Sequence, residues 1–475
     1  MDCSSSRLLR LAVAAGLLGS GLGLSSTAKA EKTLVKTDKY QIFTDGRAGG
    51  FLSWVYGDGR PRAHQVFGTD PTTGERTHAG SWNILGGEVE APAETELEDD
   101  PVLAADGVQT QGTINMMRLR SGFVGNSFGF GIRYSLTEST TATAYIQMWT
   151  FVESPARNKG NPNPGDLKQG YGKIEGPFGM FLAGRGRCLF SRGASDINGM
   201  YAHAYGVGFP AALDNTGPTR GMIGFGVMGS GWSGTIQYAT PNLAGLQLTV
   251  GLMDPIQNQA ATFLRTKYPR EEAELRYHLE LGDWGLIEPF VNGAYQKLYR
   301  DGYCDPNAPP DPVTGRDVGY CEAAAYGVGY GGRLEVGPVH LGFAGHFGEG
   351  LGLTRALEVS TASTDQSDHL RRFDGYYLQS QLVLGNVDLF AGAGMVRVFL
   401  TTYDKNARID DPLNPGVTLP AYSLIKNQIG MNAGVVYHWD DSVHFDLDYF
   451  RAEFNWYLGE QQIIHALNGG MTVTW

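Results

Sequence analysis

The stretch Glu272-Ala273-Glu274-Leu275-Arg276-Tyr277-His278-Leu279-Glu280-Leu281 decides the fold. Every odd-numbered position in it is apolar, and every even-numbered position is charged or histidine. Because successive side chains of a β-strand point to opposite faces, the segment predicts a strand with one apolar and one polar face. A strand that separates lipid from water needs this division.

The same two-residue period recurs along the rest of the chain and predicts sixteen strands. They cover residues 40–56, 113–136, 141–152, 170–176, 180–188, 232–240, 245–253, 270–281, 285–299, 323–336, 338–349, 371–384, 387–401, 422–438, 443–457 and 464–475. In 443–457 the apolar positions change from Phe445, Leu447 and Tyr449 to Ala452, Phe454 and Trp456, which predicts a β-bulge near Phe450.

The connections between these segments alternate in length. Short ones such as Gly282-Asp283-Trp284 and Asp440-Asp441 contain turn residues, whereas every second connection is long, as in 57–112 and 189–231. Short turns at one end and long loops at the other are typical of a transmembrane barrel. The expected fold is therefore all-β: an antiparallel up-and-down transmembrane β-barrel of about sixteen strands, with both termini on the periplasmic side.

The N-terminal residues predict an export signal. Arg7 and Arg10 precede an apolar stretch from Leu11 to Leu24, and small residues follow up to Ala28-Lys29-Ala30. We expect residues 1–30 to be a signal peptide and residues 31–475 to be the barrel domain. No later run approaches the roughly 18 apolar residues of a spanning helix. The sequence therefore favours an outer-membrane location in a Gram-negative bacterium.

Three cysteines remain after the signal. Cys304 and Cys321 flank a segment rich in Pro, Asp and Gly and are expected to form a disulfide in an oxidising compartment. Cys188 is expected to be buried and unpaired, with a reactive or intermolecular thiol as the alternative.

The chain carries a net charge of -12, which makes nucleic acid an unexpected partner. Acidic residues gather between Glu88 and Asp106 in the first long connection. They predict a solvated loop, with a cation bridge to lipopolysaccharide or a contact to a neighbouring subunit as alternatives.

Three further segments resemble the general bacterial porins, the trimeric sixteen-stranded channels of the outer membrane. Arg120-Ser121-Gly122-Phe123-Val124-Gly125 resembles the family's Arg-x-Gly-Phe-x-Gly, and the hairpin from Tyr171 to Arg187 resembles the one that ends in Gly-Arg before its third loop. Tyr238-Ala239-Thr240-Pro241-Asn242-Leu243-Ala244-Gly245-Leu246 is similar to its Tyr-x-Ser-Pro-x-Phe-x-Gly-Phe turn. The first loop, 57–112, is longer than the family's, and the third lacks Pro-Glu-Phe-Gly-Gly.

The resemblance implies a homotrimeric porin that carries small hydrophilic solutes and ions passively, with residues about 189–231 folded into the lumen as a constriction loop. Alternation along the strands predicts that Arg118 and Arg120 point inward, and likewise Arg185 and Arg187. The opposite face would carry Met117 and Leu119 in the first strand and Met180 and Leu182 in the second. An acidic loop opposite a basic wall would orient polar solutes. The expected constriction residues are Arg118, Arg120, Arg185, Arg187, Arg192, Asp196 and Asp214, with Arg220 and Arg397 as further lumenal candidates.

Two alternatives remain. A substrate-specific channel for sugars or amino acids would use aromatic side chains such as Tyr201, Tyr205 and Phe209 as a saturable track. An outer-membrane hydrolase would need Ser191, Asp196 and His203 at the rim, but the sequence has no Gly-x-Ser-x-Gly elbow and no His-Glu-x-x-His pattern. We expect no enzyme activity, no metal and no cofactor.

Overall fold

The computed structural model describes residues 31–59, 61, 64–69, 76–86, 113–122, 125–150, 152, 165–202, 221–256, 266–300, 304–309, 319, 321–354, 363–365, 367–411, 416–420 and 422–475. The expected signal peptide, Asp214 and the acidic run from Glu88 to Asp106 lie outside these residues.

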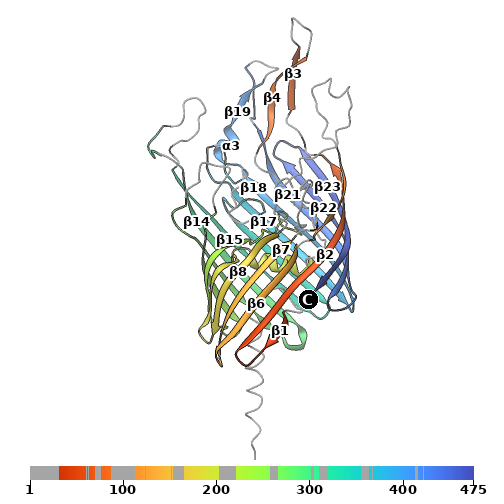
Figure 1. The fold of residues 1–475 in the computed structure, drawn as a ribbon. Helices are drawn as coiled ribbons and strands as arrows, with labels where there is room; N and C mark the ends of the chain where they lie inside the picture. The colour runs from red at the N-terminus through yellow and green to blue at the C-terminus, as the bar shows by residue number, and fades with distance from the viewer. Residues whose placement is uncertain are drawn as a thin grey trace, which may run out of the picture.

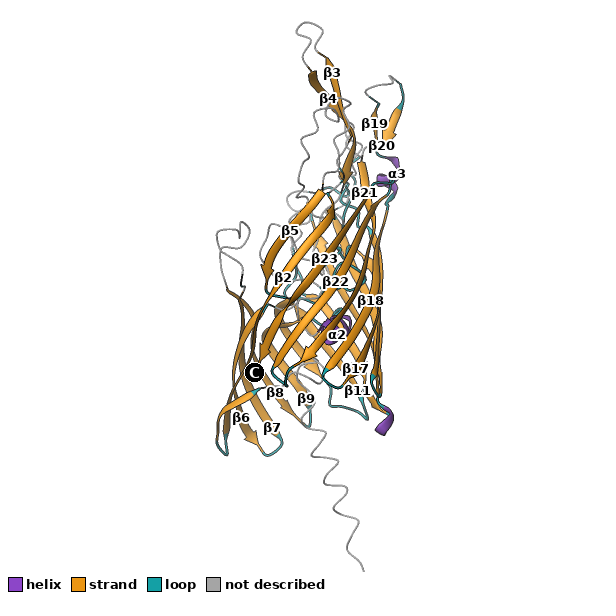
Figure 2. Cartoon of the chain, turned by 90° about the vertical axis from the view of Figure 1, so that its right-hand side faces the viewer, coloured by secondary structure: helices purple, strands orange, loops and turns teal. Residues whose placement is uncertain are grey.

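One antiparallel sheet closes on itself, as Figures 1 and 2 show, when β23 (Gln461–Thr474) pairs with β2 (Tyr40–Asp58). Between them run β5 (Thr113–Arg120), β6 (Asn126–Thr137), β7 (Thr140–Thr150), β8 (Gly165–Gly176), β9 (Gly179–Arg187), β10 (Trp232–Ala239), β11 (Leu246–Met253), β12 (Arg270–Tyr277), β13 (Leu279–Glu280), β14 (Leu286–Tyr299), β15 (Glu322–Val336), β16 (Val339–Glu349), β17 (Arg372–Leu384), β18 (Val387–Phe399), β21 (Tyr422–His438) and β22 (Val443–Trp456).

The described residues contain sixteen barrel strands, as the sequence predicts. The segments β5 and β6 count as one barrel strand, because they pair with successive parts of β2. The segments β12 and β13 likewise count as one, because both pair with β14. Closure leaves no open edge in the sheet, which a membrane-spanning sheet requires.

Smaller elements lie around the barrel. The strand β1 (Lys32–Lys36) pairs with the start of β2. The hairpin of β3 (His64–Thr69) and β4 (Arg76–Gly86) rises above the rim within the first long connection (Figure 1). The helix α3 (Thr402–Asn406) and the short strands β19 (Arg408–Asp410) and β20 (Thr418–Pro420) follow β18, and the 3-10 turn η2 (Gly282–Trp284) precedes β14.

The closing seam is fixed by the last residue of the chain. Trp475 and Gly46 exchange both backbone hydrogen bonds, at 3.0 and 3.1 Å. The indole of Trp475 lies over Gly46, where an added Cβ would come within 2.3 Å of the ring. The terminal strand is therefore held along its length against the first barrel strand.

The outer face of the barrel is apolar. Leu119 and Ile236 each expose 64% of their surface, and Met117 and Leu378 expose 61% and 60%. Their strand neighbours point the other way and are buried or partly buried. The described cysteines also match the sequence predictions: Cys304 and Cys321 form a disulfide with a Cα–Cα distance of 5.6 Å, and Cys188 is free and buried.

The predicted bulge near Phe450 is wrong. The register of β22 with β21 and β23 is continuous through Phe450, and the irregularity falls on β21, between Ile425 and Asn427. Phe450, Ala452, Phe454 and Trp456 are all at most 2% exposed and keep one face, the inner one. The inner face of the strand is apolar there because the lumen contains a packed core, and the polar residues Arg451, Glu453 and Asn455 take the outer face.

Candidate functional site

The chain turns into the lumen directly after β9. The carboxylate oxygen Oε2 of Glu272, on the inner face of β12, accepts hydrogen bonds from the backbone N–H groups of Leu189 and Phe190, at 2.6 and 3.0 Å. The side-chain oxygen of Asn292 accepts from the N–H of Ser191, whose φ of 60° is left-handed. Buried amides need partners, so these two wall residues fix the point where the chain leaves the sheet.

The helix α2 (Arg192–Ala202) follows and lies inside the barrel (Figure 2). Asp196 of this helix pairs with Arg187 at the end of β9, at 2.5 Å, and with Arg276 of β12, at 2.9 Å. Arg192 pairs with Glu274 at 2.6 Å. Wall and loop are thus joined by neighbouring ion pairs: the loop contributes the carboxylate of Asp196 to one and the guanidinium of Arg192 to the next.

The pKa of Asp196 reflects this environment. Burial alone would raise it, but the positive charges of Arg187 and Arg276 more than compensate, so the pKa of Asp196 lies below its ordinary value. Asp196 therefore remains ionised at neutral pH. In contrast, burial raises the pKa of the Cys188 thiol to about 12, which keeps this thiol protonated and inert.

The segment Gly221–Ser230 returns along the opposite wall and is held there by apolar packing. The ring of Phe225 meets those of Phe450 and Phe454 edge to face, with centroids 5.1 and 5.7 Å away. An added Cβ at Gly430 would come within 2.6 Å of Phe225, and one at Gly394 within 2.2 Å of its carbonyl oxygen. Only a wall without side chains at these two positions lets the segment come so close.

A core inside the lumen results from this packing. Its fully buried members come from the inward segment and from strands across one side of the barrel, among them Phe190, Ile197, Met222, Val227, Leu298, Phe373, Tyr377, Val396, Trp456 and Ile464. The helix α2 packs against β15, β16 and β17. This side of the lumen is therefore filled by protein.

Two long connections cover the same side. The N–H of Gly229 donates to the carbonyl of Thr354 in the connection after β16, at 2.7 Å. In the same connection, Arg371 forms a bidentate pair with Asp404 of α3, at 2.7 and 2.8 Å. These contacts tie the inward segment to two neighbouring loops.

Charged side chains also line the wall away from this core. On the inner faces of β6 and β8, Arg133 pairs with Glu31 at 2.9 Å and Lys173 with Glu175 at 2.7 Å. The hydroxyl of Tyr145 donates to Asp45, at 2.8 Å. These residues give the remaining lumen a polar wall with both signs of charge.

The expected constriction residues fall into different places. Arg118 and Arg120 are on the inner face opposite Ser53 and Phe51, and Arg120 is only 2% exposed. Arg187, Arg192 and Asp196 meet at the start of the inward segment. Asp214, Arg220, Tyr205 and Phe209 lie outside the described residues, as does the side chain of Tyr201.

Arg185 corrects the sequence prediction. It pairs with Gly170 and Gly234, on the face that carries the exposed Phe181, so its side chain points outward. There its Nε donates to the carbonyl of Leu167 at 2.9 Å. The parity was misread because β9 carries apolar residues on both faces.

Arg397 is also on the outer face, where it pairs with Asp374 beside Tyr376. The prediction that Arg397 lines the lumen is therefore wrong.

Several residues of the site were not predicted from the sequence. Glu272, Glu274 and Arg276 are the polar face of the decisive alternating segment, so their inward direction was available. Phe225 carried no such signal, because its role depends on Phe450 and Phe454 far along the chain.

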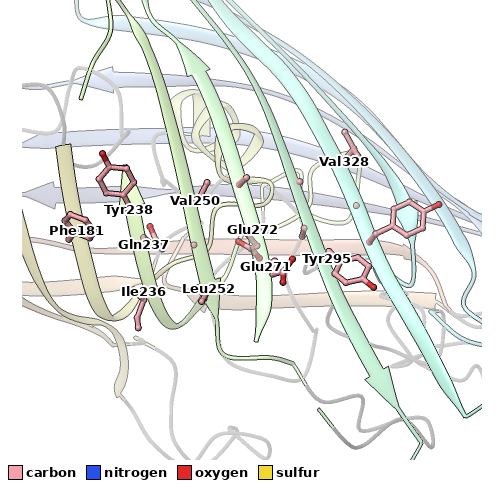
Figure 3. A pocket seen from close by; sticks show the side chains of 16 residues that line it. Phe181, Ile236, Gln237, Tyr238, Val250, Leu252, Glu271, Glu272, Tyr295 and Val328 are labelled. Carbon is pink, nitrogen blue, oxygen red and sulfur yellow. The ribbon is translucent and has the colours of Figure 1, made fainter. Parts of the chain in front are cut away.

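The outer wall of β9–β15 has a shallow groove of about 660 Å³ (Figure 3). Phe181, Ile236, Tyr238, Leu252 and Tyr295 line it from the outward side. Its apolar lining continues the lipid-facing surface, so we do not assign it to the functional site. Within the described part of the chain, no group of three metal-ligating side chains is arranged to hold a metal ion, and no helix has the length and apolar character to cross a membrane.

Solved structures share this architecture. The outer membrane channel DcaP of Acinetobacter baumannii superposes with a TM-score of 0.58 at 9% identity, over 93% of this chain and 99% of that one. The fold is that of this outer-membrane channel. The anion-selective porin of Comamonas acidovorans superposes with a TM-score of 0.52 at 11% identity, over 92% of this chain and 100% of that one. No protein-family model and no curated protein matches the sequence.

Proposed function

We propose that the protein is a porin, a passive channel for small hydrophilic solutes and ions across the outer membrane, without catalytic activity. The observation that carries the proposal is that the described parts of the inward segment, residues 188–202 and 221–230, pack along one side of a sixteen-stranded barrel and leave charged walls elsewhere. A barrel of this size encloses an aqueous lumen unless something narrows it.

The proposed constriction comprises Arg118, Arg120, Arg187, Arg192, Asp196 and Asp214, to which the structure adds Arg276. Arginines that stay charged at all relevant pH values, next to acids on the inward segment, produce a field that favours polar solutes. Asp196 pairs with both Arg187 and Arg276, so one carboxylate faces two guanidinium groups at this point of the lumen.

Arg185 and Arg187 provide a matched pair of variants for testing this proposal. They are two residues apart, but Arg187 contacts Asp196 and Arg185 points outward. In planar bilayers, Arg187→Ala should change the single-channel conductance and the reversal potential in a salt gradient, whereas Arg185→Ala should change neither.

Two results would count against the proposal. Absence of any conductance from folded wild-type protein would reject the channel function. Equal effects of the two arginine variants would reject the placement of the constriction. Concentration-dependent block by one class of sugar or amino acid would favour the substrate-specific channel instead.

We also propose that the protein forms homotrimers in contact with lipopolysaccharide. The resemblance to the porin family supports trimers. Polar groups on the outer wall add to this: Arg451 pairs with Glu453 at 2.8 Å, and Asn455 donates to Asn427 at 2.8 Å. Such groups are unfavourable against hydrocarbon but suit a headgroup or another subunit. Native mass spectrometry from detergent should give the mass of three chains; a monomer would reject the trimer.

A further inference from the structure

The inner wall of β18, β21, β22 and β23 carries an acidic patch at its periplasmic end. Asp388, Asp446 and Asp448 all point inward and are at most 5% exposed. Asp446 pairs in register with Val436 on β21, which pairs in turn with Asp388 on β18. Asp448 is two residues further along the strand of Asp446. Asp446 and Asp448 are therefore next to each other on one inner surface, and Asp388 lies on the same surface two strands away.

Two of the three have side-chain partners. Asp388 accepts hydrogen bonds from His438 and Gln381, both at 2.8 Å, and Asp448 accepts one from Asn468 at 2.9 Å. Asp446 differs from both, because no side chain of the described residues donates to either of its carboxylate oxygens.

The register gives the surroundings of Asp446 on the wall. Its rung partners are Val436 and Gly470, and its neighbours on the same strand and face are His444 and Asp448. The diagonal positions on the two adjoining strands are Gly434, His438, Asn468 and Thr472. These described positions hold two carboxylates, Asp446 and Asp448, and no lysine or arginine.

The histidines of this patch are already engaged with other groups. His438 and His444 are joined through their Nδ1 atoms, 2.8 Å apart. With His438 donating its Nε2–H to Asp388, its Nδ1 accepts from the Nδ1–H of His444, so both rings are satisfied in the neutral form. They therefore need not supply the missing positive charge.

Aromatic rings flank the carboxylates. An added Cβ at Gly470 would come within 2.6 Å of the ring of Phe51, and one at Gly434 within 2.4 Å of the ring of Phe390. Each ring thus lies over a glycine that is the rung partner of Asp446 or Asp448. Rings beside carboxylates favour a small cation over an anion, because the ring face is electron-rich.

A buried ionised carboxylate without a partner is costly, so it either takes up a proton or binds a cation. We propose that Asp446, with Asp448 and Asp388 beside it, binds a small monovalent cation, an alkali ion or a primary ammonium, in the periplasmic half of the lumen. A multidentate divalent site is not the alternative, since the described side chains form no three-ligand metal group. This proposal rests on the proposed channel function in one respect: permeating cations would reach the site through the channel.

Cation binding to Asp446 is tested in crystals, independently of any ion flux. Crystals of the wild type in rubidium chloride should show anomalous density beside Asp446, and crystals of Asp446→Asn should lack it. Soaking in methylammonium with rubidium should reduce that density if the site also accepts ammonium; unchanged density would restrict the site to alkali ions. Absence of rubidium at the wild-type site would overturn the proposal, because Asp446 would then be a protonated structural residue.

Bilayer recordings measure the contribution to permeation. A unit charge about 5 Å from the path alters the local cation concentration roughly fourfold in water and less with screening. Asp446→Asn should therefore lower the potassium-to-chloride permeability ratio about twofold to fourfold. The control Glu271→Gln removes an outward-facing charge of β12 and should leave the ratio unchanged (Figure 3). An unchanged ratio in Asp446→Asn with a conducting wild type would overturn a role in permeation, whereas a silent wild type would count only against the channel function.

Discussion

The contact of Phe225 with the wall should determine whether the inward segment stays in place. Phe225 is 2% exposed, and its ring meets Phe450 and Phe454 edge to face. Truncating a buried phenylalanine to alanine costs about 3–5 kcal/mol, to which each aromatic pair contributes about 0.5–1.5 kcal/mol. Since about 1.4 kcal/mol corresponds to a factor of ten, Phe225→Ala should shift the equilibrium between seated and displaced segment by roughly two to three and a half orders of magnitude.

The assay combines single-channel recording with exclusion of neutral polymers of graded size. Phe225→Ala should show larger or noisier openings and admit larger polymers than the wild type. Phe225→Leu keeps most of the apolar volume and should lie between the two. The control Phe343→Ala removes an outward ring that is 42% exposed and should leave conductance unchanged.

One result would refute this reasoning. If Phe225→Ala keeps the wild-type conductance, noise and polymer limit, while its barrel melts at the same temperature in detergent, the apolar contact does not hold the segment. A lower melting temperature with unchanged conductance would assign the contact to stability alone.

Three further predictions concern the base of the inward segment and the surface loop. Arg187 lowers the pKa of Asp196 below its ordinary 3.8, so the stabilisation of the folded state by this ion pair is complete above that pH and is lost as pH falls through the lowered value. Conductance should therefore be constant from pH 7 to about 4 and change only in stronger acid. Asp196→Asn should remove that transition. Glu272→Ala removes the ion-pair partner of the buried Arg270 and the acceptor of two buried amides, and it should cost about 3–5 kcal/mol, measured as a lower melting temperature of the barrel; an unchanged value would contradict the anchoring role. Replacing Cys304 and Cys321 by serine should leave conductance unchanged but speed proteolysis between them, and equal proteolysis rates would show that the disulfide does not restrict this loop.

The barrel was predictable because lipid and water impose opposite demands on the two faces of every strand. The segment Glu272–Leu281 shows the period without exception, and the sixteen predicted strands agree with the structure apart from their ends. The disulfide and the buried Cys188 were predictable from spacing and compartment. Each of these features depends on local sequence and on the solvent next to it.

The lumen was less predictable, because its inner face meets water at some positions and protein at others. Phe454 and Trp456 suggested a change of phase in β22, whereas they keep their inward direction and cover a packed segment. In β9, apolar residues occupy both faces, so parity misplaced Arg185. A two-residue period identifies the faces of a strand only where the inner face is polar.

The two walls of the lumen therefore control different properties. Phe225 against Gly394 and Gly430 is a core contact, so it sets how far the inward segment projects and hence the width of the passage. Asp196 and Asp446 contribute charge, and charge changes which ions are concentrated in that width. Substitutions at the apolar seat should therefore change the size limit with little effect on the ratio of cation to anion flux, and substitutions of the acids should do the reverse. A channel built in this way can alter its charge preference without altering the packing that keeps it narrow.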